Sequence, residues 1–240
     1  MARNTRGTVK LTVVALLSAL TLIPASAAAQ LNVHLDWAQE LADNLPAANN
    51  VYDTSPFYVT WPGVNGATKY SNRTLCSNFL TAVLRQSYGW TTNHFSSWLG
   101  STSPNAEMYF DAILAEDGFE MIHTIQDIDG GDIVALQYES DNPTSGHVGI
   151  AEGPASPRGA TEPIVPNTQQ WEMWIIDSTR NGHGWTDSRY QNGSWAQGAG
   201  RGMIRFYTDA QGFIVGHTWT TTSSAYYSTA LRDIVVGRLL

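Results

Sequence analysis

The sequence of 240 residues contains a single cysteine, Cys76. One cysteine cannot form a disulfide within its own chain, so a folded domain must be held together by packing and hydrogen bonds. A lone cysteine in a protein is most often a small buried hydrophobic residue. A chemical role for Cys76 therefore needs support from the residues around it.

Basic residues are also scarce. The chain has 13 Lys and Arg residues against 21 Asp and Glu residues, a formal net charge of −8 at pH 7. Such a surface repels the phosphate backbone of DNA or RNA, which nucleic-acid-binding proteins attract with stripes of Lys and Arg. The composition therefore argues against nucleic acid as a partner.

Long apolar runs are missing except near the N-terminus. The run "LTVVALLSALTLI" has about 13 residues, whereas a membrane-spanning helix needs roughly 20. Arg3, Arg6 and Lys10 precede it, and the small residues of "PASAAAQ" follow it. This order is typical of a secretory signal peptide over residues 1–29. We expect a mature chain that begins near Gln30, is secreted or periplasmic, and has no membrane partner.

Hydrophobic spacing predicts helices in the first half of the chain. One helix is expected at 31–45, and a second begins close to Cys76 and is closed by "YGW". A third is expected at 104–116, with Ser103 as its N-cap, Pro104 at its first position and Gly118 as its stop signal.

The second half of the chain predicts strands, because apolar and β-branched segments alternate with clusters of Gly, Asn and Pro. The expected strands are 131–138, 146–153, 171–178, 202–209, 212–220 and 232–239. Helices followed by antiparallel strands indicate an α+β fold. The length after the signal peptide suits a single domain over residues 30–240.

Three segments have no clear period. The first, 46–70, is long for an irregular connection and predicts a functional loop or a strand-like arm. The segment 154–170 is rich in proline, and 179–200 is rich in glycine and aromatic residues. Loops of this length in a compact domain often act as lids or binding loops.

Cys76 lies at the expected start of a helix, where unbonded backbone N–H groups and the helix dipole favour a thiolate. The same N–H groups can stabilise an oxyanion. A thiol nucleophile also needs a base, and His147, at the head of a strand, is the strongest of the six histidines. Asp177 ends the next strand and would orient His147, with Asn181 and His183 as alternative partners.

The order of these segments resembles the papain-like NlpC-type peptidases and CHAP amidases. In these enzymes a cysteine at a helix N-terminus, here "LCSNF", precedes a Gly-Asp strand, here "GDIVAL", and then a histidine strand, here "GHVGIAEG". The similarity extends over about residues 70–178. It implies a papain-like fold, with N-terminal helices packed on an antiparallel sheet, and the catalytic residues Cys76, His147 and Asp177.

The same resemblance implies a mechanism and a substrate. Cys76 would attack an amide carbonyl, His147 would protonate the departing amine, and water would hydrolyse the thioester. A tyrosine upstream of the cysteine supplies an oxyanion donor in relatives, and Tyr70 is the candidate here. The expected substrate is a peptidoglycan stem peptide or cross-link, and no cofactor is implied.

Other functions stay open. The stretch "WIIDST" around Asp177 also resembles the Asp strand of transglutaminase-like enzymes, which would make the protein an acyl transferase. Trp185, Tyr190 and Trp195 lie in one glycine-rich loop and could stack on sugar rings, in a carbohydrate-binding protein or in the substrate groove of an amidase. A catalytically inactive papain-like scaffold would keep the fold without a reactive thiol.

No metal site is expected. The stretch "DIDGGD" (127–132) is similar to an acidic calcium loop but lacks the ligand spacing of an EF-hand. His183 and Asp187 could approach His147, but the three do not have a recognised zinc spacing.

Overall fold

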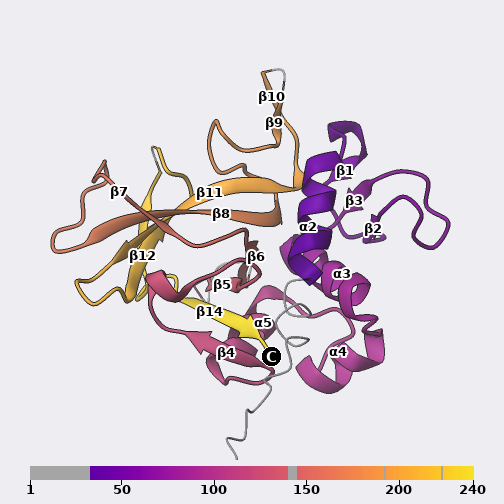
Figure 1. The fold of residues 1–240 in the computed structure, drawn as a ribbon, viewed down its shortest axis with the longest axis horizontal. Coiled ribbons are helices and arrows are strands. Elements are labelled where there is room, and N and C mark those ends of the chain that lie inside the picture. The colour runs from indigo at the N-terminus through magenta and orange to yellow at the C-terminus, as the bar shows by residue number, and fades with distance from the viewer. Residues whose placement is uncertain (1–32, 140–144, 192, 223) are drawn as a thin grey trace, which may run out of the picture.

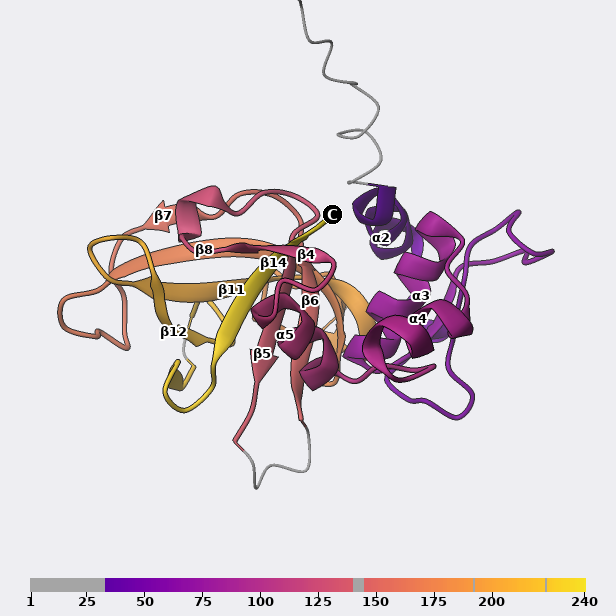
Figure 2. The same cartoon turned by 90° about the horizontal axis from the view of Figure 1, so that it is seen from below.

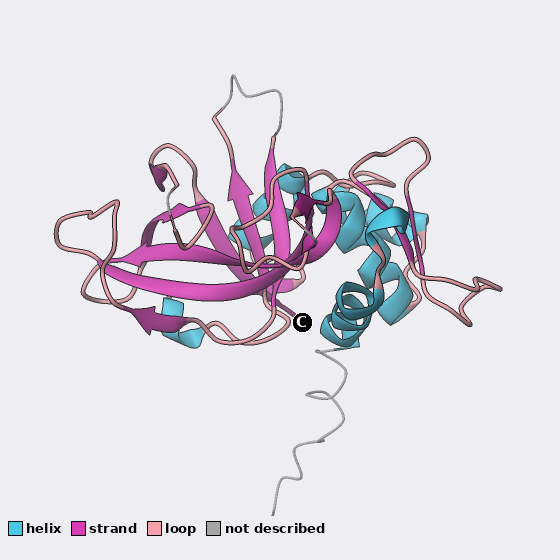
Figure 3. Cartoon of the chain, turned by 90° about the horizontal axis from the view of Figure 1, so that it is seen from above, coloured by secondary structure: helices cyan, strands magenta, loops and turns pink. Residues whose placement is uncertain are grey.

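The computed structural model describes residues 33–139, 145–191, 193–222 and 224–240. The helices gather on one side of the molecule and the strands of the largest sheet on the other (Figures 1, 2 and 3). The expected signal peptide, residues 1–29, lies outside the described residues. Within the described ranges, no helix is both long enough and apolar enough to span a membrane.

The helices of the described chain fall before the main strands, as expected for the α+β fold. They are α2 (Val33–Asn44), α3 (Cys76–Tyr88), α4 (Thr92–Leu99) and α5 (Ala106–Leu114), with short 3-10 turns at Ala47–Asn49 and Ile125–Asp127. Helix α3 buries Phe79, Leu80, Val83 and Leu84 on one face. It ends at Gly89, whose left-handed backbone (φ 67°) glycine adopts without strain.

The largest sheet is antiparallel throughout. Its strand order is β13-β12-β11-β8-β6-β5-β14-β4, and β7 pairs with β8 beside this path. The strands are β4 (Phe119–Ile122), β5 (Ile133–Gln137), β6 (Gly146–Ala151), β7 (Ser156–Arg158), β8 (Gln169–Thr179), β11 (Gly198–Thr208), β12 (Ile214–Thr218), β13 (Tyr226–Ser228) and β14 (Ile234–Leu239). An antiparallel sheet of this size agrees with the expectation from the strand pattern.

The segment 46–70 contributes to a second, small sheet, as the expectation of a strand-like arm anticipated. This sheet has the order β1-β3-β2, from β1 (Asn50–Val51), β2 (Tyr58–Thr60) and β3 (Ser71–Arg73). It is tied to the large sheet through the Asn50 side chain, whose Oδ1 accepts from the Ala199 N–H (2.9 Å). The chain that leaves β1 is thereby held close to the start of β11.

Both faces of the large sheet are covered by apolar packing. Along β5, Ile133 and Ala135 face a core shared with the helices, whereas Val134 and Leu136 face a second core. The alternation follows from the period of two along a strand. Because the central strands are buried on both faces, they are apolar at nearly every position, which made them easy to predict.

The ends of α5 differ from the expectation. Asn105, not Ser103, caps this helix, because its Oδ1 accepts from the Met108 N–H (2.9 Å). The Ser103 hydroxyl instead accepts from the Asn78 side chain (2.9 Å), so it is engaged elsewhere. Pro104 therefore lies before the helix rather than at its first position.

Several elements were not predicted, among them helix α4, strand β4 and the short strands β7 and β13. Helix α4 buries only Phe95, so its sequence lacks the apolar stripe on which a helix prediction depends. Strand β4 is four residues long, at the lower limit of the alternating runs that mark a strand. The predicted strand at 232–239 is present as β14, which lies between β5 and β4 in the sheet.

Strand β11 begins at Gly198, four residues before the predicted start, within a segment taken as a loop because of its glycines. These glycines make room for the chain that packs over the strand. A Cβ atom on Gly202 would lie 2.6 Å from Asp187 Oδ2 and 2.6 Å from the His183 Cβ. A Cβ atom on Gly200 would lie 2.8 Å from Ser188 Oγ. The loop that contains these residues can therefore sit directly on the strand.

We predict that Gly202→Ala lowers the free energy of unfolding by about 1–3 kcal/mol, because the added methyl group overpacks a tight contact. Gly159→Ala is the matched control, since a Cβ atom there meets nothing within 4 Å. Urea unfolding of the two variants checks the difference. Equal stability would mean that the loop does not pack on β11 as described.

Candidate functional site

Cys76 is the first residue of α3 and is buried, with 5% of its surface exposed. The residue before it, Leu75, has an extended backbone and supplies no side-chain cap. The N–H groups of the first helical turn are therefore free of a side-chain competitor and lie beside the sulfur. This is the position that the sequence predicted for Cys76.

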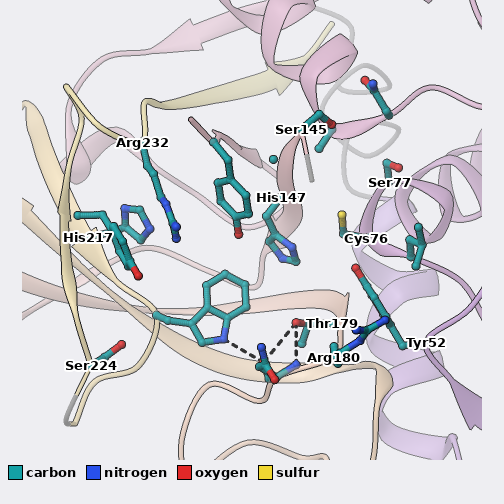
Figure 4. A pocket seen from close by; sticks show the side chains of 18 of the residues that line it. Tyr52, Cys76, Ser77, Ser145, His147, Thr179, Arg180, His217, Ser224 and Arg232 are labelled. Atoms are coloured by element: carbon teal, nitrogen blue, oxygen red, sulfur yellow. Dashed lines mark hydrogen bonds between the residues drawn. The ribbon is translucent and has the colours of Figure 1, made fainter. Parts of the chain in front are cut away.

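His147 lies on β6, between β5 and β8, and is also buried. Its Nε2 is 2.6 Å from Asp177 Oδ2. Because Nε2 is engaged by the carboxylate, the other ring nitrogen, Nδ1, is the one available to the Cys76 sulfur. Figure 4 shows the imidazole between the sheet and the end of the helix that carries Cys76.

The pKa of His147 rises to about 10 in this environment. Burial acts in the opposite direction and lowers it, but the negative charge at Cys76, the hydrogen bonds to Asp177 and Cys76, and the charge of Asp177 outweigh burial. At neutral pH the ring therefore carries two protons.

Asp177 lies near the end of β8, and the pairing of β6 with β8 brings it to His147. The two strands are antiparallel neighbours, with Ile150 opposite Ile176. Gly149 leaves space for the aspartate, because a Cβ atom there would be only 3.2 Å from Asp177 Cβ. The contact between His147 and Asp177 predicted from the sequence is thus present.

The Asp177 carboxylate is fully buried and is shared by three basic side chains. Its Oδ2 accepts from His147 and from His183 Nε2 (2.9 Å), and its Oδ1 accepts from Arg189 Nη1 (2.8 Å). Burial alone would raise the pKa of Asp177. The charges of Arg189 and His183 and the histidine hydrogen bonds hold it well below the usual range, so Asp177 is ionised.

Arg189 is buried as well and bridges two carboxylates. Besides Asp177, its Nη2 and Nε donate to Asp187 Oδ2 and Oδ1, both at 2.8 Å. Burial would lower the pKa of Arg189, but the two aspartates raise it overall. The paired charges satisfy one another, which a buried ionic cluster requires.

His183 was an alternative partner for the base, and it contacts Asp177 rather than replacing it. Its Nδ1 is 2.9 Å from the Trp219 carbonyl oxygen, and its Nε2 faces the Asp177 carboxylate. Both partners are acceptors, whereas a neutral imidazole has only one N–H. The ring of His183 is held between these two acceptor oxygens.

Trp219 covers the bond between His147 and Asp177. Its ring centroid lies 4.8 Å from that of His147, edge to face, and 4.3 Å from that of His183. The indole N–H donates to the Asn181 carbonyl oxygen (2.9 Å), which fixes the ring in place. Shielding from water strengthens the buried hydrogen bond.

A cavity of about 710 Å³ opens over Cys76 and His147 (Figure 4). Its lining also includes Tyr52, Tyr138, Arg180, Asn181, His217, Trp219, Tyr227 and Arg232. Cys76 and His147 thus share one cavity with several aromatic and basic side chains. Within the described ranges, no cluster of His, Cys, Asp or Glu side chains is arranged to hold a metal ion.

Tyr70, the predicted oxyanion donor, does not lie in this cavity. Its hydroxyl instead donates to Glu40 Oε1 of α2 (2.9 Å). Tyr52, which follows β1, lines the cavity instead. Burial raises the pKa of Tyr52, and the charge at Cys76 raises it further, so its hydroxyl stays protonated and can donate.

The three aromatic residues of the loop at 179–200 lie together but outside this cavity. Ring centroids are 4.9 Å apart for Trp185 and Tyr190 and 4.9 Å apart for Tyr190 and Trp195. Trp185 is 67% exposed. They do not line the cavity at Cys76 and form a separate surface cluster.

Comparison with known proteins gives one relative without an assigned role. The chain is 29% identical over 218 residues to an uncharacterized protein of Acanthamoeba polyphaga mimivirus, covering 85% of this chain and 95% of that protein. No family model matches the chain. No solved structure matches it either.

We predict that Asp177→Asn lowers the free energy of unfolding by about 3–5 kcal/mol at pH 7, because it leaves buried cations without their counter-charge. The folded-state pKa of Asp177 lies below its ordinary value of 3.8, so its stabilisation is present above that pH and is lost as the pH falls through the folded-state pKa. Urea titrations at pH 7 measure the effect.

Asp111→Asn is the control for this variant, since Asp111 is exposed on α5. Its effect should stay within about 0.5 kcal/mol. If the two variants unfolded alike at pH 7, the charge cluster would not be the stabilising feature described here.

Proposed function

We propose that the protein is a cysteine hydrolase that cleaves amide bonds, with Cys76 as nucleophile, His147 as acid and base, and Asp177 as the residue that orients His147. One observation carries the proposal. The only thiol of the chain begins a helix, and the same cavity contains a buried histidine that a buried aspartate holds at 2.6 Å. A cysteine used only as core filler needs none of these partners.

The first step would be attack of the Cys76 thiolate on the substrate carbonyl carbon. The C–N bond electrons of the amide return to nitrogen as the tetrahedral intermediate collapses, and the proton on His147 Nδ1 passes to that nitrogen. The amine leaves, and a thioester on Cys76 remains. The Cys76 N–H and the Tyr52 hydroxyl would donate to the oxyanion, since Cys76 begins α3 and both residues line the cavity.

The second step would be hydrolysis of the thioester. His147, now neutral, takes a proton from water, and the resulting hydroxide attacks the carbonyl carbon. The C–S bond breaks, the acid is released, and Cys76 and His147 return to the thiolate and imidazolium forms. Asp177 keeps its charge throughout and holds the ring through Nε2.

The substrate we propose is peptidoglycan, cleaved as an endopeptidase or amidase of its stem peptides or cross-links. The proposal rests on the expected signal peptide, which would deliver the protein outside the cytoplasm, and on the resemblance to papain-like wall hydrolases. The cysteine-bearing helix packed against an antiparallel sheet that carries the histidine and aspartate supports the papain-like assignment. Transfer of the acyl group to another amine is the alternative outcome of the same thioester.

A second function, carbohydrate binding, is favoured by the exposed cluster of Trp185, Tyr190 and Trp195. Exposed aromatic rings stack on the apolar faces of sugars. Because the cluster lies outside the cavity of Cys76, glycan binding and cleavage are separable. Loss of the thiol would abolish cleavage and leave binding to the glycan unchanged.

We predict that the reduced protein releases new amino and carboxyl groups from purified peptidoglycan, and that Cys76→Ala abolishes the release. His147→Gln should lower the rate by about 10²–10⁴-fold, the usual contribution of a general acid or base. His123→Gln is the matched control, because His123 is exposed and does not line the cavity. Chromatography of the soluble fragments measures the rates.

The products also separate the alternatives. Free acids indicate hydrolysis, whereas new amides indicate transfer to an amine. Protein that keeps its thiol reduced yet leaves both peptidoglycan and peptide amides uncut would contradict the proposed function.

A further inference from the structure

The cavity at Cys76 has an unusual charge for this protein. The chain carries 21 acidic residues and a net charge of −8. Among the described residues that line the cavity, however, there is no Asp or Glu, whereas Arg180 and Arg232 are both present. Although the protein is acidic overall, the charged side chains around Cys76 in this cavity are therefore basic.

Arg180 is an exposed cation on the Cys76 side of the cavity, beside Tyr52 and Thr179 (Figure 4). Its guanidinium carbon lies 5.8 Å from the centroid of the Tyr52 ring. In the described part of the chain, no carboxylate forms an ion pair with it. Its charge is therefore available to a ligand.

Arg232 lies on the opposite side of His147 from Cys76 (Figure 4). It is held rigidly, because its guanidinium stacks on Tyr227 (3.7 Å to the centroid) and contacts Tyr138 (4.5 Å). Its Nε is 3.2 Å from both carboxylate oxygens of Glu139, which does not line the cavity. Glu139 offsets part of the charge but fixes the orientation of the guanidinium.

His217 supplies a second, independent observation beside Arg232. It lines the cavity and is only 1% exposed, yet its Nδ1 has no hydrogen-bond partner among the described residues. Burial lowers the pKa of His217 to about 3, with help from the charges of Arg232 and His147, so its ring is neutral. A buried polar nitrogen without a partner is costly, so a ligand atom that bonded to it would offset that cost.

We infer that this cavity binds a carboxylate of the substrate, with Arg232 and His217 as its immediate partners and Arg180 as a second cation. A guanidinium recognises a carboxylate by charge and by paired N–H donors. A neutral imidazole can add one further N–H donor without a charge of its own. The substrate class is then an amide that has a free carboxylate close to the bond that Cys76 attacks.

This inference specifies the substrate of the proposed hydrolase and rests on that function for its biological meaning. The carboxylate site itself does not require a reactive thiol. The two can therefore be tested apart, because Cys76→Ala removes the nucleophile and leaves Arg180, Arg232 and His217 in place.

The test is a chemical-shift titration of the full-length Cys76→Ala protein with three matched probes. N-Acetylglutamine has a terminal carboxylate, N-acetylisoglutamine has a side-chain carboxylate, and N-acetylglutaminamide is neutral. We expect at least one acid to bind and the neutral amide to bind about tenfold more weakly, the usual size of a hydrogen-bonded charge contact. The acid that binds identifies the position of the carboxylate in the substrate.

Three further variants locate the site in the same Cys76→Ala background. Arg232→Gln and, to a smaller extent, Arg180→Gln should weaken binding of the acid, with a loss of about tenfold for Arg232. Arg85→Gln is the matched control, because Arg85 is exposed on the same helix as Cys76, about 14 Å further along its axis. It should bind the acid as the parent does.

The inference is overturned if neither acid binds, if the neutral probe binds as tightly as the acids, or if both cavity variants keep full affinity. None of these results would contradict the proposal that the wild-type protein cleaves amides. Conversely, the Cys76→Ala protein could bind a carboxylate while the wild-type protein cuts no amide. That result would contradict the proposed function, but the carboxylate site would still stand.

Discussion

The buried carboxylate of Asp177 is the interaction on which the rest of the site depends. A lone carboxylate without solvent would protonate rather than keep its charge. Here two histidines and one arginine surround it and hold its pKa well below the usual range. The retained negative charge then helps keep His147 protonated next to Cys76. The protonation of His147 is thus supported partly by groups that never touch the cavity.

The backbone is arranged so that this cluster can exist. Strand β11 has glycine at 200 and 202, opposite Asp177 and Ile175 of β8, which lets the loop of His183, Asp187 and Arg189 lie against the sheet. Gly149 makes the corresponding space on β6. Trp219 then closes over both histidines. The glycines of the strands leave space that the side chains of the loop fill. The charged groups of the cluster are therefore both buried and paired.

The sequence allowed the α+β fold, the helix start at Cys76 and the meeting of His147 with Asp177 to be predicted, because each depends on local periodicity or on the pairing of neighbouring strands. Tyr52 and Arg189 could not be found this way. Their positions depend on how an irregular arm and a glycine-rich loop fold back onto the sheet, which no local pattern encodes. The alternating glycines at 198, 200 and 202 were the one available signal, since every second position faces the same side of a strand.

The most direct test of this account is the charge of His147, followed by ¹⁵N and ¹H NMR of the ring as the pH is raised. The account predicts that His147 keeps both ring protons at pH 7 and loses one near pH 10, because its pKa is raised to about 10. In Cys76→Ser the transition should move to lower pH, since the charge at Cys76 is the largest of the influences that raise this pKa. A ring that is neutral at pH 7 in the wild-type protein, or a titration unchanged by Cys76→Ser, would contradict the thiolate–imidazolium pair.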